Sequence, residues 1–273
     1  MDRSAGDGLE PTLSVVTVNR NMRAGLAHTI ESVRRSTATR LEHVVIDGAS
    51  TDGSRALLES AQAGLRWWSE ADGGIYDAMN KGVARAAGTW VLFLNAGDVL
   101  DGADALAPLQ RAMREADTAD ILYGDVRVAY PDGTVAARPA RPLGTMPQGM
   151  PFAHAAAAIR RDLLIARPYE TDGQACDYAF FLRCWAAGRR FRYVPGAVAT
   201  IEAGGVSDRR RVRSTVERWR AVRRADLVSA PLAAWYAAAL MRAALAPPLA
   251  RMTPRGLRRR LRGALPDPGS AAR

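Results

Sequence analysis

The stretch "GGIYDAMNKGVARAAGTWVLFLNAGD", residues 73–98, joins a helix pattern to an apolar run and ends in polar residues. Residues 76–87 predict a helix, and residues 89–96 predict a fully buried strand. A helix that leads directly into a buried strand is typical of a mainly parallel sheet. The stretch also holds Lys81, the only lysine in a chain whose other cationic side chains are arginines. Its polar residues make it the first place to look for a site.

Two strand–helix units precede this stretch. Residues 13–20 are a β-branched apolar run, and residues 22–36 place apolar side chains at helical spacing. The pattern repeats with a strand at 41–48 and a helix at 55–62, and residues 65–70 form a third short strand. We therefore predict an α/β fold, Rossmann-like, with a mainly parallel sheet and helices on both faces.

The second half of the chain is less regular. Residues 120–139 read as two extended segments around a Pro-Asp-Gly turn, which predicts a hairpin. A loop rich in Pro and Gly follows at 139–151, and residues 176–188 predict a helix. The regular first half is of the α/β type that often binds nucleotides, and we expect the second half to form one wall of a cleft beside it.

Composition limits the class of protein. With 273 residues and 48% hydrophobic content, the chain can bury a large core. Cys176 and Cys184 lie eight residues apart in a predicted helix, roughly 12 Å, which is too far for a disulfide. The first residues lack the pattern of a secretory signal. A cytoplasmic location is expected.

Positive charge is concentrated at the end of the chain. The chain has a net charge of +10, and residues 207–273 alone carry +12, because they hold 16 Arg and four acidic residues. Residues 227–241 carry no charge but fall short of the roughly 20 needed to span a bilayer. Trp235, Tyr236 and Leu240, followed by a basic run, suit a helix lying on an anionic membrane. A helix packed on the domain with a solvated basic end explains them equally well; we favour attachment at the inner face of the cytoplasmic membrane.

Polar residues follow each predicted strand of the first half. They include Asn19, Asp47, Asp72 and Asp98, and any one of them alone is as easily a helix cap as a ligand-binding group. Ligands of open parallel sheets bind at this carboxyl edge, so the convergence of several favours a site. No glycine-rich phosphate loop follows the first strand and no Walker A sequence occurs, which disfavours a dehydrogenase or a P-loop NTPase. Carboxylates here suit hydrogen bonds to a base or ribose, or a divalent cation.

Five stretches together resemble the inverting nucleotide-sugar glycosyltransferases of glycosyltransferase family 2, which have the GT-A fold: "LSVVTVNRN", "HVVIDGASTDGS", "SEADGGIYDAMNKGVARAAGTWVLFLNAGD", "CDYAFFLRCWAAG" and "EAGGVS". The nearest relatives look like bacterial exopolysaccharide and glycolipid enzymes of the colanic-acid type. The resemblance covers residues 12–208 and implies a nucleotide-sugar-binding half (12–100) and an acceptor half (101–208). It leaves a flexible N-terminus (1–11) and a basic helical tail (209–273), which is the segment expected on the membrane.

The resemblance implies a hexosyltransferase whose donor site is formed by Thr17, Asn19, Asp47, Asp72, Asn80, Lys81 and Asn95. Thr17 would line the nucleotide pocket, and Asp47 and Asp72 would contact the base and ribose. Asn80 and Lys81 would face the sugar-phosphate region, and the glycines before them would let the backbone approach the nucleotide. UDP is the favoured nucleotide, and the acceptor would be a glycan or a polyprenyl-linked sugar.

The resemblance also implies two catalytic elements. Asp98 ends the family's metal-binding element and would hold Mn or Mg against the diphosphate, although the element is reduced here to Asn95-Ala96-Gly97-Asp98. Asp177, at the start of a helix, stands where the family keeps its catalytic base, and the residues alone would favour a helix-dipole role for it.

Four further residues are candidates for contacts with the diphosphate or the acceptor: His154, Gly204, Gly205 and Ser207. Relatives often place His-Gln where this chain has His154-Ala155, and a lone histidine beside an alanine run is more often structural. The glycines resemble a family loop near the phosphates, and their alternative is an ordinary turn.

Two other functions compete with glycosyl transfer. A sugar-1-phosphate nucleotidyltransferase would share the sheet order, but it would need a glycine- and arginine-rich loop directly after the first strand, where this chain has "TVNRNMRAG". A nucleic-acid-binding protein would use the basic tail, but the acidic strand ends argue against it, and we expect no nucleic-acid partner.

Overall fold

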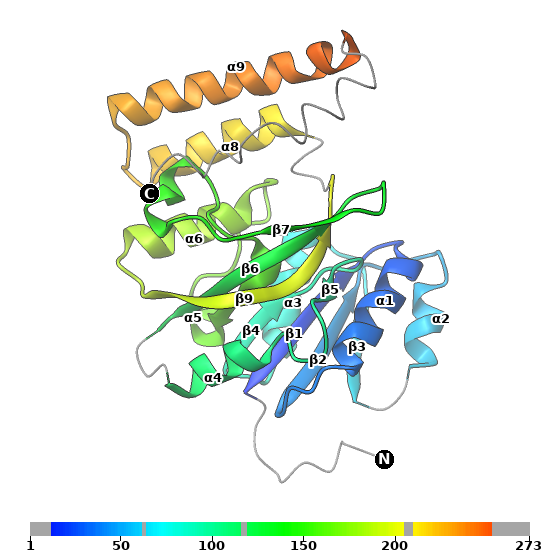
Figure 1. Cartoon of the computed structure of the whole chain (residues 1–273). Helices are drawn as coiled ribbons and strands as arrows, with labels where there is room; N and C mark the ends of the chain where they lie inside the picture. The colour runs from blue at the N-terminus through cyan, green and yellow to red at the C-terminus, as the bar shows by residue number, and fades with distance from the viewer. Residues whose placement is uncertain (1–11, 62–63, 116–118, 205–209, 253–273) are drawn as a thin grey trace.

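A curled sheet runs through the middle of the protein, and its strands follow the order β3-β2-β1-β4-β8-β6-β9-β5, with β7 beside β6 (Figure 1). The computed structural model describes residues 12–61, 64–115, 119–204 and 210–252. Helices cover both faces of the sheet, and two further helices lie together beyond one of these faces (Figure 1). Sheet and helices therefore form the layered α/β arrangement that the sequence predicts.

The first half alternates strands and helices as predicted. Its elements are β1 (Leu13–Asn19), α1 (Arg23–Arg34), β2 (Leu41–Asp47), α2 (Ser54–Glu59), β3 (Leu65–Ser69), α3 (Ile75–Arg85) and β4 (Trp90–Phe93). The pairs β1–β2, β1–β4 and β2–β3 are all parallel. The ends of these four strands, where the predicted site residues lie, therefore meet at one edge of the sheet.

The second half is mixed. Its elements are β5 (Val99–Leu100), α4 (Ala107–Glu115), β6 (Ile121–Ala129), β7 (Val135–Arg138), the 3-10 turns η1 (Leu143–Gln148) and η2 (His154–Ala156), β8 (Ala157–Arg160), α5 (Arg161–Ala166), α6 (Cys176–Ala186) and β9 (Phe191–Glu202). Strand β8 is antiparallel to both β4 and β6, whereas β9 is parallel to β6. The antiparallel pair β6–β7 confirms the predicted hairpin.

Neighbouring residues of the central strands belong to different cores. Val15 lies in a core that includes α4, whereas Val16 lies in a core that includes residues of α3, α5 and α6. Both side chains are fully buried, because successive residues of a strand point to opposite faces of the sheet. A strand buried on both faces reads as a continuous apolar run, which is the pattern in the sequence.

The C-terminal helices α8 (Arg211–Arg224) and α9 (Ala230–Met252) pack on the rest of the fold (Figure 1). Val222 and Tyr236 are buried in the same core as α6. The hydroxyl of Tyr236 lies 3.0 Å from the carbonyl oxygen of Pro147. The expectation that Tyr236 sits at a membrane interface is therefore wrong, because packing against the domain uses this side chain. None of the helices in the described parts of the chain has the length and apolar character needed to cross a membrane.

Candidate active site

Asp47, the last residue of β2, ties together the ends of three strands. Its carboxylate accepts hydrogen bonds from Nδ2 of Asn19 at 2.7 Å, Oγ of Ser69 at 2.7 Å, and both the hydroxyl and the N–H of Ser50. Burial by itself raises the pKa of Asp47, but the hydrogen bonds from Ser50, Ser69 and Asn19 outweigh it and hold the pKa below its usual range. The carboxylate is thus kept ionised beneath the edge of the sheet.

Asn19 has one unused group in this arrangement. Its Nδ2 also reaches Oγ of Ser50, at 3.2 Å. Its Oδ1 is buried and has no hydrogen-bond partner within the described chain. A buried carbonyl oxygen without a partner carries a free-energy penalty that a bound donor group would remove.

Thr17 lies in the sheet interior. Its side chain is fully buried, and its hydroxyl lies 2.9 Å from Nε2 of His43 on the neighbouring strand. Burial lowers the pKa of His43 to about 3, so the imidazole is neutral at ordinary pH. The hydroxyl of Thr17 is therefore already used inside the core, and the predicted contact with the nucleotide stays a prediction.

Asp72 lies where β3 leads into α3. Its carboxylate accepts the N–H of Gly74 at 3.0 Å, and Nη1 of Arg20 lies 3.8 Å away. A Cβ atom at Gly48 would collide with Oδ2 of Asp72. The glycine after β2 therefore gives Asp72 the space to reach the end of that strand, and the structure brings Asp47 and Asp72 to the same edge.

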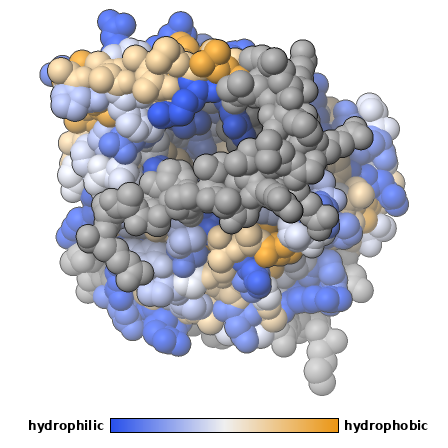
Figure 2. All heavy atoms as spheres, turned by 45° about the horizontal axis from the view of Figure 1, so that its top comes forward, coloured by the Kyte–Doolittle hydropathy of each residue, from blue (hydrophilic) through white to orange (hydrophobic). Residues whose placement is uncertain are grey.

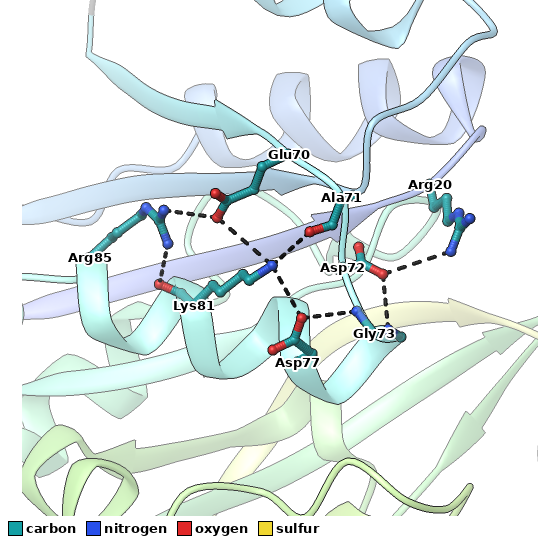
Figure 3. A network of polar contacts seen from close by, with 9 residues as sticks. Arg20, Glu70, Ala71, Asp72, Gly73, Asp77, Lys81 and Arg85 are labelled. Carbon is teal, nitrogen blue, oxygen red and sulfur yellow. Dashed lines mark hydrogen bonds and ion pairs between the residues drawn. The ribbon is translucent and has the colours of Figure 1, made fainter.

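Lys81 braces the loop before α3 (Figure 3). Its Nζ donates to the carbonyl oxygen of Ala71 at 2.8 Å and lies 3.1 Å from Oδ2 of Asp77 and 3.9 Å from Oε1 of Glu70. Asp77 in turn accepts the N–H of Gly73 at 2.9 Å. The lysine thus connects this acidic loop to the helix that follows it. Its contacts are within the protein, and its predicted role toward the sugar-phosphate stays a prediction.

Asn80 connects α3 to the segment before α6. Its Nδ2 donates to the carbonyl oxygen of Tyr169 at 2.9 Å, and its Oδ1 accepts the N–H of Tyr169 at 3.0 Å. An amide that pairs in both directions with one backbone residue is a structural link. No pattern in the sequence predicts this link, because the partners lie 89 residues apart. A role for Asn80 in donor binding stays a prediction.

Asp98 lies near a second carboxylate. Burial, together with the negative charge of Glu202, raises the pKa of Asp98 to about 7, and backbone hydrogen bonds from Glu202 and Asn95 only partly offset this. Oδ1 of Asn95 is buried without a hydrogen-bond partner in the described residues. Two carboxylates and an amide oxygen are the oxygen ligands that Mn and Mg accept, and a cation would relieve the repulsion between the carboxylates.

These groups fit a divalent cation only if oxygen atoms of a bound diphosphate complete its coordination. Across the described ranges, no group of three or more His, Cys, Asp or Glu side chains is placed to hold a metal by itself. A cation bound through few protein ligands plus phosphate oxygens is the usual arrangement for Mg. The residues present therefore suit a metal that binds together with a diphosphate.

Asp177, in the first turn of α6, is hydrogen-bonded to the first turn of α3. The hydroxyl of Tyr76 lies 3.0 Å from Oδ1 of Asp177 and 3.0 Å from the carbonyl oxygen of Gln174. Tyr76 belongs to the stretch "GGIYDAMNKG", but no pattern in the sequence marks it as a site residue. Its position beside Asp177, 101 residues further along the chain, follows only from the way the fold brings α3 and α6 together.

His154 lies in the same buried surroundings. Its Nε2 is 2.9 Å from the hydroxyl of Tyr169. Burial lowers the pKa of His154, and the negative charge of Asp177 raises it by a smaller amount. The structure therefore brings His154 and Asp177 close enough to interact, together with Tyr76 and Tyr169, two tyrosines that the sequence reasoning missed.

Gly204 is the described residue of the glycine loop predicted after β9. Gly204 follows the end of β9 with a φ of 85°, a conformation that favours glycine. Gly205 and Ser207 lie outside the described residues. The predicted contact of this loop with the diphosphate stays a prediction.

Comparisons of sequence place the chain among glycosyltransferases. A protein-family model described as Glycosyl transferase family 2 matches residues 14–188, more than half of the chain. An uncharacterized glycosyltransferase of Mycobacterium tuberculosis is 41% identical over 116 residues, which are 42% of this chain and 44% of that protein. A PGL/p-HBAD biosynthesis glycosyltransferase of Mycobacterium bovis is 39% identical over 120 residues, 42% of this chain and 47% of that protein. Each match spans less than half of its relative, and the expected colanic-acid resemblance is not confirmed.

Comparisons of structure confirm the GT-A fold. The mannosyltransferase PcManGT from Pyrobaculum calidifontis, solved with GDP-Man and Mn2+, aligns with a TM-score of 0.62 at 19% identity over 90% of this chain and 77% of that one. TarS from S. aureus, solved with UDP-GlcNAc, aligns with a TM-score of 0.63 at 18% identity over 85% of this chain and 72% of that one. At these identities the likeness extends to the fold alone.

Proposed function

The chain belongs to glycosyl transferase family 2, and on this premise we propose that it is an inverting enzyme that moves a hexose from a nucleotide-diphosphate sugar to an acceptor hydroxyl. One observation carries the proposal. Asp72 accepts the N–H of Gly74, and two residues further on the hydroxyl of Tyr76 contacts Asp177. The proposed nucleotide contact, Asp72, thus begins a short segment whose other end, Tyr76, contacts the proposed base. Donor and acceptor would meet beside the first turn of α3.

The proposed chemistry is a single displacement. The acceptor oxygen bonds to the anomeric carbon, the bond from that carbon to the diphosphate breaks, and its electron pair leaves with the diphosphate. Asp177 takes the proton of the acceptor hydroxyl. Attack opposite to the leaving group inverts the anomeric centre. Asp177 suits this role because Tyr76 fixes its carboxylate through a hydrogen bond.

A divalent cation, Mn or Mg, would be held by Asp98 with Glu202 and Asn95. When bound, it neutralises negative charge on the leaving diphosphate. Without it, the raised pKa of Asp98 leaves a large fraction of this carboxyl protonated near pH 7. Because the described residues offer few ligands, phosphate oxygens of the donor would complete the coordination of the cation, and we propose that donor binding and cation binding depend on each other.

The proposed acceptor is a glycan or a lipid-linked sugar at a membrane surface, in the synthesis of a bacterial surface glycolipid or polysaccharide. One relative has a name that refers to PGL/p-HBAD biosynthesis. UDP is the proposed nucleotide, and TarS, a structural neighbour, was solved with UDP-GlcNAc. Figure 2 shows an apolar band along α9 beside hydrophilic residues. Met241 is 64% exposed and Leu245 is 56% exposed on this helix, which suits contact with lipid.

Nucleotide binding tests the donor site. Thermal stability is measured with UDP, GDP, dTDP and CMP, each with and without Mn, for the wild type and for Asp98→Ala. We expect one nucleotide to raise the Tm only with Mn, and the variant to lose this rise. Asp177→Asn should keep the rise in Tm and lose transfer. Full transfer activity in Asp177→Asn would remove the assigned base, and equal stabilisation with and without metal would remove the cation.

A further inference from the structure

Glu217 on α8 holds the backbone immediately before α6. Its Oε2 accepts the N–H of Gln174 at 2.6 Å and the N–H of Ala175 at 3.1 Å. Its Oε1 accepts from Nε of Arg213 at 2.9 Å. The side chain is 15% exposed, so water competes little for these bonds. A helix from the C-terminal region thus fixes the entry to the helix that carries Asp177.

The peptide that Glu217 holds is also bound from its other side. The carbonyl oxygen of Gln174 and Oδ1 of Asp177 both lie 3.0 Å from the hydroxyl of Tyr76. A tyrosine hydroxyl has one proton, so it donates fully to only one of the two oxygens at a time. A Cβ atom at Gly173 would lie 3.3 Å from Oε2 of Glu217, so the backbone here is packed closely against the carboxylate. Glu217, Gln174, Tyr76 and Asp177 form one chain of contacts across three helices.

We propose that Glu217 is a positioning residue for the base: it fixes the Gln174 carbonyl as the alternative acceptor for the Tyr76 hydroxyl. While Asp177 is ionised, Tyr76 donates to it. Once Asp177 has taken the proton of the acceptor hydroxyl, Tyr76 donates to Gln174 instead, and its own proton never leaves. The inference rests on the proposed function, because it takes Asp177 as the base.

The surroundings of Tyr76 agree with this role. Burial and the charge of Asp177 raise the pKa of Tyr76, so the hydroxyl stays protonated and acts only as a donor. A charged carboxylate attracts the donated proton more strongly than a peptide carbonyl does. The preference of Tyr76 therefore changes when Asp177 is neutralised. The position of the Gln174 carbonyl then decides how readily Asp177 can take a proton.

Glu217→Ala and Glu217→Gln test the proposal against Glu59→Ala and Glu59→Gln. Glu59 is a suitable control because it also pairs with an arginine four residues earlier, Arg55, at 2.8 Å, but it is on α2. Release of nucleoside diphosphate from UDP-glucose and GDP-mannose gives kcat, the donor KM and the pH–rate profile. Amide hydrogen exchange of residues 172–178 measures how firmly Glu217 holds this backbone segment, and it needs no enzymatic turnover.

We expect Glu217→Ala to lower kcat by roughly 10- to 100-fold with the donor KM unchanged, because the base is misplaced while the donor site is intact. The acidic limb of its pH–rate profile should move, and exchange at 172–178 should rise. Glu217→Gln keeps an acceptor oxygen and should lie between the wild type and Glu217→Ala, so it still tests the proposal if the alanine variant does not fold. The Glu59 variants should match the wild type in all four readouts.

If Glu217→Ala exchanges faster at 172–178 but keeps the wild-type kcat and pH–rate profile, the proposal is overturned, and Glu217 only stabilises the local backbone. If its exchange rate at 172–178 is unchanged, Glu217 does not hold this backbone segment, and the proposal is overturned as well. The proposed function fails in a different way: Asp177→Asn would keep full turnover, whatever Glu217 does. If the wild type releases no nucleoside diphosphate from either donor, exchange at 172–178 still decides whether Glu217 fixes this segment, and an unchanged rate would again overturn the proposal.

Discussion

At the scale of single residues, Tyr76 connects the donor-side segment to the proposed base. Its hydroxyl contacts Asp177 and Gln174, and the centroid of its ring lies 5.7 Å from the ring centroid of Tyr169. Removing only the hydroxyl therefore separates the hydrogen bond from the packing. The same ring in Phe would keep the core filled.

We expect Tyr76→Phe to lower kcat by about tenfold, because the Asp177 carboxylate loses the hydrogen bond that holds it in place. Steady-state kinetics measure the effect. Tyr178→Phe is the control, because the Tyr178 hydroxyl binds the Met146 carbonyl oxygen at 3.1 Å in the same core. A kcat of Tyr76→Phe equal to that of the control would contradict the assignment.

His43 gives the fold a defined sensitivity to acid. Its folded pKa of about 3 lies below the value near 6.5 of an unfolded histidine. Below pH 6.5 the folded state therefore binds fewer protons than the unfolded state. The contribution of the neutral His43 to the free energy of unfolding is fully present above pH 6.5 and is lost as the pH falls from 6.5 toward 3.

We expect the free energy of unfolding to lose about 2 kcal/mol from His43 alone between pH 8 and pH 5. In His43→Gln, which can still pair with Thr17, this part of the pH dependence should be absent. Urea unfolding at the two pH values measures it. His28→Gln, at an exposed position on α1, is the control and should keep the wild-type slope. If the free energy of unfolding changes equally between pH 8 and pH 5 in His43→Gln and in the wild type, the pKa of His43 does not cause this pH dependence.

At the scale of elements, α3 and its preceding loop form a unit that Lys81 holds together. Lys81 contacts Ala71, Asp77 and Glu70, and Arg85 adds an ion pair to Glu70 at 2.8 Å. The helix thus fixes a loop whose next residue, Asp72, is the proposed nucleotide contact. Loosening the loop should therefore affect donor binding more than stability.

We expect Lys81→Met to raise the donor KM by roughly tenfold and to change the free energy of unfolding by no more than about 1 kcal/mol, because ion pairs at partly exposed positions contribute little. Arg55→Met, which breaks the exposed pair with Glu59 on α2, should leave the KM unchanged. Donor titrations and urea unfolding give both quantities. An unchanged donor KM in Lys81→Met would show that donor binding does not depend on the contacts between Lys81 and this loop.

At the scale of the whole molecule, α8 and α9 combine two roles. Their inner sides are part of the core, with Val222 and Tyr236 buried, and Glu217 reaches the entry of α6. The outer side of α9 exposes Met241 and Leu245. The two sides of this helical pair can therefore be tested separately.

We expect the double variant Met241→Glu and Leu245→Glu to keep the wild-type Tm and to lose most of its binding to phosphatidylglycerol vesicles, because the exposed apolar side chains contact lipid in the proposed arrangement. Vesicle sedimentation and thermal unfolding measure the two quantities. Val135→Glu, at a 48%-exposed position on β7, is the control and should bind vesicles like the wild type. Undiminished vesicle binding by the double variant would place the membrane contact elsewhere.

Local patterns were enough to predict the elements and their class. The apolar runs of β1, β2 and β4, the hairpin β6–β7 and the helix α6 are visible in the sequence, because burial and turn chemistry act on neighbouring residues. Polar residues after parallel strands also had to meet at one edge. These patterns therefore predicted the α/β class, whereas the family and the GT-A fold followed from the resemblance of five stretches to glycosyltransferase family 2. The roles of the individual site residues stay predictions.

Only the tertiary structure decided which residues touch across long separations. Tyr76 and Asp177 are 101 residues apart, and Tyr236 and Pro147 are 89 apart. The sequence favoured a membrane position for Tyr236 because an aromatic residue near arginines suits both an interface and a core. It gave Glu217 no role, because the N–H groups that it binds belong to the backbone and leave no pattern in residue types. Side-chain periodicity determines the elements, but the contacts between them depend on how whole faces pack.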